Sequence, residues 1–115
     1  MLFRSRKLLT WFDRSGRQSG TIGVPGTYNN LRLSRDGHRI VGDETDPDGR
    51  HTDIWIHEIA QGLPATRLTF DPSLHWTPVW SPDGKQILFS ANRKLGMQLY
   101  VKNAEREHEI GRAHV

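Results

Sequence analysis

Cysteine is absent from this chain of 115 residues, and long apolar runs are absent too. Without cysteine, a disulfide framework and thiolate metal sites are excluded. No apolar stretch approaches the roughly 18 residues of a membrane-spanning helix, and the N-terminal sequence has no continuous apolar stretch of signal-peptide length. An apolar period of 3.6 residues does not persist for three turns anywhere. We therefore expect no membrane segment, no export signal and no long amphipathic helix.

The chain also has only a small net charge, since it contains 16 basic and 13 acidic residues. The basic excess lies within the first 17 residues, and acids and bases are interspersed elsewhere. A nucleic-acid-binding protein more often gathers its basic residues on one face, so we expect no nucleic-acid partner. The chain does have 11 glycines and 6 prolines. This composition is typical of a turn-rich globular protein.

Two turn sequences, residues 33–37 and 80–84, match one another at a spacing of 47 residues. Both contain Asp-Gly, a strong hairpin signal because glycine accepts a positive φ and the aspartate bonds nearby backbone. Three apolar runs, which start at Leu9, Ile54 and Leu99, match at spacings of 45 residues. Matches at such a fixed period predict a repeated supersecondary unit.

The segments around these turns are rich in Val, Ile, Trp, Tyr and Phe, and several alternate apolar with polar residues. This pattern predicts strands. The predicted strands cover residues 9–13, 19–23, 28–33, 39–43, 53–58, 66–70, 75–80, 86–90 and 98–102. Four short strands in about 45 residues are typical of one propeller blade. We therefore predict an all-β fold, a partial β-propeller of about two and a half four-stranded antiparallel blades.

The blade boundaries follow from the phase of this pattern. Residues 1–27 would form the last two strands of a blade, residues 28–73 a complete blade, and residues 74–108 an incomplete blade. Closed propellers have roughly 4–8 blades, so we expect bare apolar faces around Trp55, Trp76 and Phe89. Such a chain alone would be poorly stable or would associate. Trp11, Trp55, Trp76 and Trp80 are expected to pack between blades.

Residues 67–72, 78–85, 87–93 and 99–101 together resemble the WD-repeat-like propeller repeat of TolB-type proteins. The resemblance extends to about Asn103, although Arg35 stands where the first turn usually has proline. Residues 9–16 and 25–28 are most similar to the propeller regions of bacterial serine/threonine kinases. The resemblance implies a bacterial, periplasmic or extracytoplasmic parent protein that binds a protein or peptide.

Residues 109–115 show no turn or strand pattern. They match one reading frame of a common sequencing adapter, and we expect them to be a non-biological tail; an ordinary unstructured tail is the alternative.

The acid-rich segment 43–49 is the one candidate for a calcium loop. The calcium-loop pattern needs a glutamate at the twelfth position, where this chain has Ile54, so we predict a solvated hairpin loop. None of the histidines has the spacing of a zinc site. They are His38, His51, His57, His75, His108 and His114. We predict no metal site and no cofactor.

The chain has no Gly-x-Ser-x-Gly elbow, no phosphate-binding loop and no kinase motif. We therefore predict no catalytic residues and no enzyme activity. The preferred function is a non-catalytic propeller scaffold for protein–protein interaction or sensing. An accessory propeller domain of a larger enzyme, either a membrane serine/threonine kinase or a prolyl-oligopeptidase-like peptidase, is the alternative. A metal-binding or carbohydrate-binding propeller would depend on the acidic loop alone.

Overall fold

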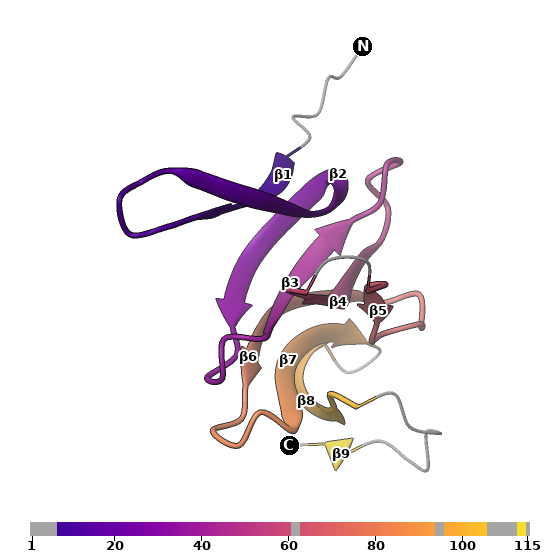
Figure 1. The fold of residues 1–115 in the computed structure, drawn as a ribbon. Helices are drawn as coiled ribbons and strands as arrows, with labels where there is room; N and C mark the ends of the chain where they lie inside the picture. Colours follow the sequence, from indigo (N-terminus) through magenta and orange to yellow (C-terminus); the bar gives the residue numbers. More distant parts are fainter. Residues whose placement is uncertain (1–6, 61–62, 94–95, 106–112, 115) are drawn as a thin grey trace.

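The computed structural model describes residues 7–60, 63–93, 96–105 and 113–114, and every regular element among them is a β-strand (Figure 1). The strands form two antiparallel sheets, one in the order β1-β2-β3-β4-β5 and one in the order β6-β7-β8-β9. The predicted all-β class is therefore confirmed. Within the described ranges there is no apolar helix of membrane-spanning length. His108 and the tail residues 109–112 and 115 lie outside the described residues.

The first sheet follows the chain order, with each strand beside the next. Its strands are β1 (Lys7–Phe12), β2 (Gln18–Leu33), β3 (Arg39–Thr45), β4 (Thr52–Glu58) and β5 (Thr66–Arg67). Hairpin connections join the first four strands, as expected for antiparallel neighbours. Strand β5 is shorter than the predicted 66–70, because the Thr69 hydroxyl and not a backbone carbonyl accepts the hydrogen bond of Ile54 N.

Strand β2 joins two strands that the sequence predicts separately, 19–23 and 28–33. Its first part pairs with β1 as far as Gly26, and its second part pairs with β3 from Thr27 onward. The proline and glycine at 25–26 indicated a break, but the backbone stays extended there and changes its partner. The β1–β2 hairpin consequently extends away from the rest of the sheet as an arm (Figure 1).

The second sheet consists of β6 (Leu74–Trp80), β7 (Gln86–Arg93), β8 (Gly96–Asn103) and β9 (Ala113–His114). Strand β9 pairs with Tyr100 and Val101 of β8. The sequence predicted no strand after residue 102, because residues 113–114 carry no alternating pattern. Backbone pairing of two residues does not require such a pattern, since it uses only N–H and C=O groups.

The β2–β3 and β6–β7 turns have the same hydrogen bonds. The Ser34 hydroxyl donates to Asp36 Oδ1 and accepts from Arg39 N, and Asp36 Oδ1 also accepts from His38 N. Gly37 N donates to Ser34 O, and its φ is 77°. The corresponding bonds join Ser81, Asp83, Gly84, Lys85 and Gln86. Arg35 in place of proline therefore leaves the turn geometry unchanged.

A backbone irregularity also recurs 47 residues apart. Asn30 in β2 and Thr77 in β6 both have a positive φ, 51° and 53°, at the register shifts of their strands. Asp43 of β3 connects the two sites, because its Oδ2 accepts from Asn30 Nδ2 at 2.8 Å and from Thr77 N at 3.0 Å. Asp43 is buried, so its assignment to the solvated loop 43–49 was wrong.

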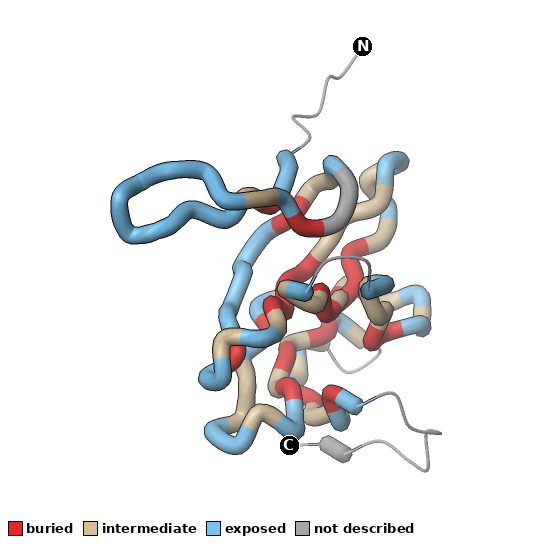
Figure 2. Tube along the Cα trace, in the orientation of Figure 1, coloured by how far each residue is buried: buried red, intermediate tan, exposed pale blue. Residues whose placement is uncertain are grey.

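The main core lies between the two sheets (Figure 2). The first sheet contributes Val41, Ile54 and Ile56, and the second contributes Ile87, Phe89, Ala91 and Tyr100. Burial of Phe89 corrects the expectation of a bare face around it, because Phe89 points toward the first sheet. A smaller core forms where the arm covers the other face of the first sheet. It contains Leu9, Ile22, Tyr28 and Ile40.

The four tryptophans have different surroundings. Trp80 packs against the main core, donates from Nε1 to Arg32 O, and lies 5.0 Å from the Arg39 guanidinium. Trp55 and Trp76 are half-buried, whereas Trp11 is exposed. Of the four, Trp80 best fits the expected packing between neighbouring sheets.

Candidate functional site

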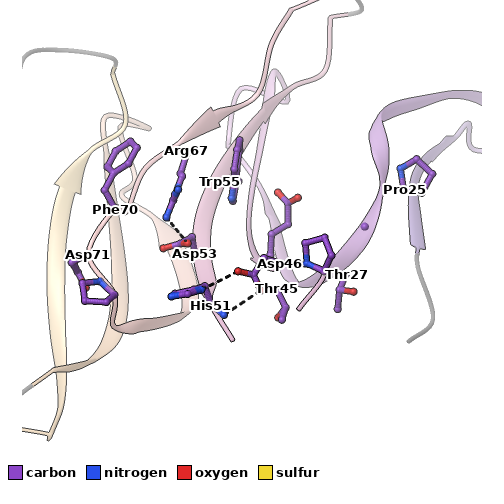
Figure 3. Close-up of a pocket in the computed structure, with 14 residues that line it drawn as sticks. Pro25, Thr27, Thr45, Asp46, His51, Asp53, Trp55, Arg67, Phe70 and Asp71 are labelled. Carbon is purple, nitrogen blue, oxygen red and sulfur yellow. Dashed lines mark hydrogen bonds and ion pairs between the residues drawn. The ribbon is translucent and has the colours of Figure 1, made fainter. Parts of the chain in front are cut away.

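A cleft of about 690 Å³ opens on the face of the first sheet that the arm leaves partly uncovered (Figure 3). Pro25 of the arm and Thr27 of the β2 segment that pairs with β3 form one wall, and the segment after β5 forms the opposite wall through Phe70 and Asp71. The β3–β4 hairpin closes one end. Binding sites are commonly concave surfaces of this size with a few polar groups, so this cleft is the candidate site.

Strand alternation explains which side chains reach the cleft. Successive residues of a strand point to opposite faces, so Asp53 and Trp55 face the cleft while Ile54 faces the core. Arg67 of β5 lies directly opposite Trp55 in the sheet register. The residues that distinguish the cleft therefore come from two adjacent strands with fixed spacing.

Asp53 holds the floor of the cleft together. Its carboxylate accepts hydrogen bonds from Thr69 Oγ1 at 2.7 Å and from Arg67 Nη2 at 2.9 Å (Figure 3 shows the Arg67 bond). His75 Nδ1 lies 3.2 Å from Asp53 Oδ1. Because Asp53 is buried, these contacts supply the pairing that a buried carboxylate requires.

The same network continues to Asp71 through the fully buried His75. His75 Nδ1 is 3.1 Å from Thr52 O, and its Nε2 is 3.2 Å from Asp71. Arg93 donates to Asp71 Oδ2 at 2.6 Å, and its guanidinium lies 3.9 Å from the Tyr100 ring centroid. His75 therefore connects β4 of the first sheet to the second sheet through polar contacts.

The carboxyls of Asp71 and Asp43 have pKa shifts of opposite sign. Burial works against ionisation of Asp71, but hydrogen bonds from the side chain and backbone of Ser73, together with the interaction with His75, outweigh it and lower the pKa of Asp71 to about 2. Burial raises the pKa of Asp43, although its hydrogen bonds from Asn30 and Thr77 act in the opposite direction.

The mouth of the cleft is aromatic and cationic. Phe70 is 65% exposed, and both Arg67 and Lys102 lie over its ring, at 5.1 and 5.4 Å from the centroid. Lys102 Nζ also donates to Leu68 O. Exposed aromatic rings and arginine are the residue types enriched in protein-binding surfaces.

Asp46, Asp48 and His51 of the β3–β4 turn could hold a cation, because one ligand atom from each lies within 4.8 Å of the others. Asp46 Oδ2 is 3.0 Å from His51 Nδ1, and both carboxylates also accept backbone hydrogen bonds from Arg50. Hydrogen bonding with Asp48 and then with His51 lowers the pKa of Asp46 to about 2. These bonds build the hairpin turn that the sequence predicts for this segment.

The remaining described histidines have structural surroundings. His57 Nε2 lies 3.0 Å from Glu44 Oε2, and its ring packs edge-on against Tyr28. His38 belongs to the β2–β3 turn. The structure thus gathers His51 near the cleft and places His57 and His75 in polar pairs within the sheets.

Sequence reasoning missed the Asp53–His75–Asp71 network. Asp71 and His75 are four residues apart, and Asp71-Pro72-Ser73 is a turn-forming sequence, so a local pair could have been expected. Asp53 is distant in sequence and has no such local signal. No family model matches the chain.

The arrangement has a chemical consequence. The carboxylates Glu44, Asp46, Asp53 and Asp71 of the cleft already accept hydrogen bonds or pair with cations of the fold. Using any of them as an acid or base would disturb a structural contact. The exposed Phe70 ring and the half-buried Trp55 ring are available for contact with another molecule. The cleft is therefore better suited to binding than to proton transfer.

Proposed function

We propose that the chain is part of a β-propeller that acts as a non-catalytic scaffold and binds a protein or peptide at the cleft. The observation that carries the proposal is the combination of an aromatic and cationic mouth with carboxylates that are already paired. Trp, Tyr and Arg are the residues that most often dominate binding energy at protein interfaces.

The arrangement of the sheets supports the propeller part of the proposal. The turns at Ser34 and Ser81 have the same hydrogen bonds, and the irregularities at Asn30 and Thr77 have nearly the same positive φ, at spacings of 47 residues. The sheets stack face to face over a shared core. Neighbouring blades of a propeller pack in this manner. The resemblance to TolB-type repeats further supports an extracytoplasmic, bacterial parent protein.

Selection of peptides from a random displayed library on the immobilised protein tests the binding proposal. We expect enriched peptides whose affinity falls at least about tenfold in the Trp55→Ala variant, about 1.4 kcal/mol, because Trp55 would be a contact residue. Trp11→Ala is the matched control, because Trp11 is exposed on the arm and does not line the cleft. Enriched peptides that bind both variants equally well would contradict the proposal.

A further inference from the structure

The second sheet has one face that packs on the first sheet and one that does not. In the sheet register Leu88 lies opposite Val101 and Ser90 lies opposite Leu99, so these residues share a face. Asn92 and Met97 continue it, and Val79 lies beside Leu88. We call this set, Val79, Leu88, Ser90, Asn92, Met97, Leu99 and Val101, the outer face; it contains no charged residue.

The outer face is apolar and open to solvent. Leu99 is 47% exposed and Met97 is 60% exposed. Both lie on the part of β8 that precedes the β9 pairing at Tyr100 and Val101. Clustered exposed apolar side chains mark interaction sites more often than single ones do.

The molecule itself shows what covers a face of this kind. By the 47-residue spacing, Leu88 of β7 corresponds to Val41 of the first sheet. By the 45-residue spacing, Leu99 and Val101 of β8 correspond to Ile54 and Ile56. Those three residues are buried under the second sheet. The covering face presents Phe89 and Tyr100.

The cleft lies on the face of the first sheet that corresponds to the core-packing face of the second sheet. By the same spacings, Phe89 corresponds to Gly42 and Tyr100 corresponds to Trp55. The arm already covers one end of this surface through Leu9 and Ile22, and the end around Trp55 stays open as the cleft. One chain thus exposes both halves of an interface that it also contains internally.

The charges of the cleft are compatible with an apolar partner. Glu44 is paired with His57, and Asp53 is paired with Arg67. Covering these pairs would therefore leave neither carboxylate without a partner, which is the costly outcome for a buried charge.

We propose that a second copy of this chain places its outer face on the cleft of the first, with Leu99 directed toward Trp55. The arrangement rests on the proposed function, because it uses the cleft as a protein-binding surface and names the partner. Different surfaces of the two copies meet, so the association is head-to-tail and builds rings or open chains.

Sedimentation velocity of the full chain between about 1 and 100 µM, where interfaces of micromolar affinity dissociate, tests this association. We expect the weight-average mass to rise with concentration for the wild type and to remain that of a monomer for Leu99→Asp. Leu63→Asp is the matched control, since Leu63 is 57% exposed and belongs to neither surface. A wild type that stays monomeric, or a mass increase that Leu99→Asp leaves unchanged, would overturn the proposal.

Mixing distinguishes a head-to-tail interface from a symmetric one. Leu99→Asp damages the outer face and Trp55→Ala damages the cleft, so each variant alone should be monomeric. Their mixture retains one intact pair of surfaces and should form a dimer that does not grow further. A mixture that contains only monomers, with both variants folded by circular dichroism, would overturn the head-to-tail arrangement.

Competition separates this inference from the proposed function. A peptide that binds at Trp55 should lower the wild-type mass toward the monomer, because it occupies the same cleft. A monomeric wild type that still binds the peptide would refute self-association and leave the binding function intact. Association without any Trp55-dependent peptide would refute peptide binding and leave the second copy as the ligand.

Discussion

The two sheets have similar strands and turns but very different burial. The second sheet covers one face of the first sheet, so Val41, Ile54 and Ile56 are buried, whereas the arm covers only the end of the other face around Tyr28 and Ile40. The second sheet is covered on one face, and Leu99 at the position that corresponds to Ile54 is 47% exposed. Similar apolar patterns therefore give different burial, because burial depends on whether another layer lies against the face.

The largest expected effect tests this difference directly. Ile54→Ala should reduce the free energy of unfolding by about 4 kcal/mol, because it leaves a cavity between two packed sheets. Leu99→Ala at the corresponding position should cost below about 1 kcal/mol, as for an exposed side chain. Urea unfolding at a dilute protein concentration measures both values. Equal losses in the two variants would show that the second sheet is as well covered as the first.

The next largest difference in stability loss should be between Asp53 of β4 and Gln98, the polar residue at the corresponding position of β8. Asp53→Ala removes the buried carboxylate that accepts from Arg67 Nη2 and Thr69 Oγ1, and we expect a loss of about 3 kcal/mol, because a buried hydroxyl and an ion pair lose their acceptor. Gln98 occupies the corresponding place in β8 and is half-buried.

Gln98→Ala is therefore the control, with an expected loss below about 1 kcal/mol. Thermal unfolding by circular dichroism compares the two variants. A small effect of Asp53→Ala would mean that the polar network does not stabilise the contact between the sheets.

Local signals predicted much of this fold. The Asp-Gly turns at Gly37 and Gly84 and the alternating residues of β4 identified the strands, because hairpin chemistry and side-chain alternation depend on neighbours in sequence. The continuous β2 was missed because Pro25 fits an extended strand where its missing N–H is not needed.

The candidate site was less predictable than the strands. The cleft depends on where the arm lies over the first sheet, and no local pattern encodes that position. Asp53 contacts Thr69 and His75, which lie up to 22 residues away in the sequence. Each residue taken alone would be interpreted as an ordinary polar residue. Asp43 looked like the start of an acidic loop, but the irregular backbone at Asn30 and Thr77 surrounds it with donors.

The pH dependence of the free energy of unfolding should show whether Asp71 stabilises the polar contact between the two sheets. The folded-state pKa of Asp71 is lowered to about 2 from 3.8, so its contribution is complete above pH 4 and is lost as pH falls toward 2. Asp71→Asn should remove this part of the acid dependence, as measured by urea unfolding from pH 2 to 7.

Asp43→Asn is the control of opposite sign. The raised folded-state pKa of Asp43 favours the folded state at low pH, and its ionisation reduces stability as pH rises. In the wild type, ionisation of Asp43 lowers the free energy of unfolding as pH rises. The Asp43→Asn variant should lack this decrease, whereas Asp71→Asn should lack an increase. Identical pH profiles for the two variants would contradict the opposite shifts.

The smallest expected effect concerns the turn that the two sheets share, at Gly37 in the first and Gly84 in the second. Gly37 and Gly84 have φ of 77° and 74°, and a Cβ at either position would meet no atom within 4 Å. The cost of alanine is therefore conformational and should be about 1 kcal/mol at each turn, the cost of a left-handed backbone for an L-residue. Chemical unfolding of Gly37→Ala and Gly84→Ala should give losses that agree within error. If Gly84→Ala cost much less, the turn of the less covered sheet would relax where the other cannot, and the difference between the sheets would extend from their faces to their turns.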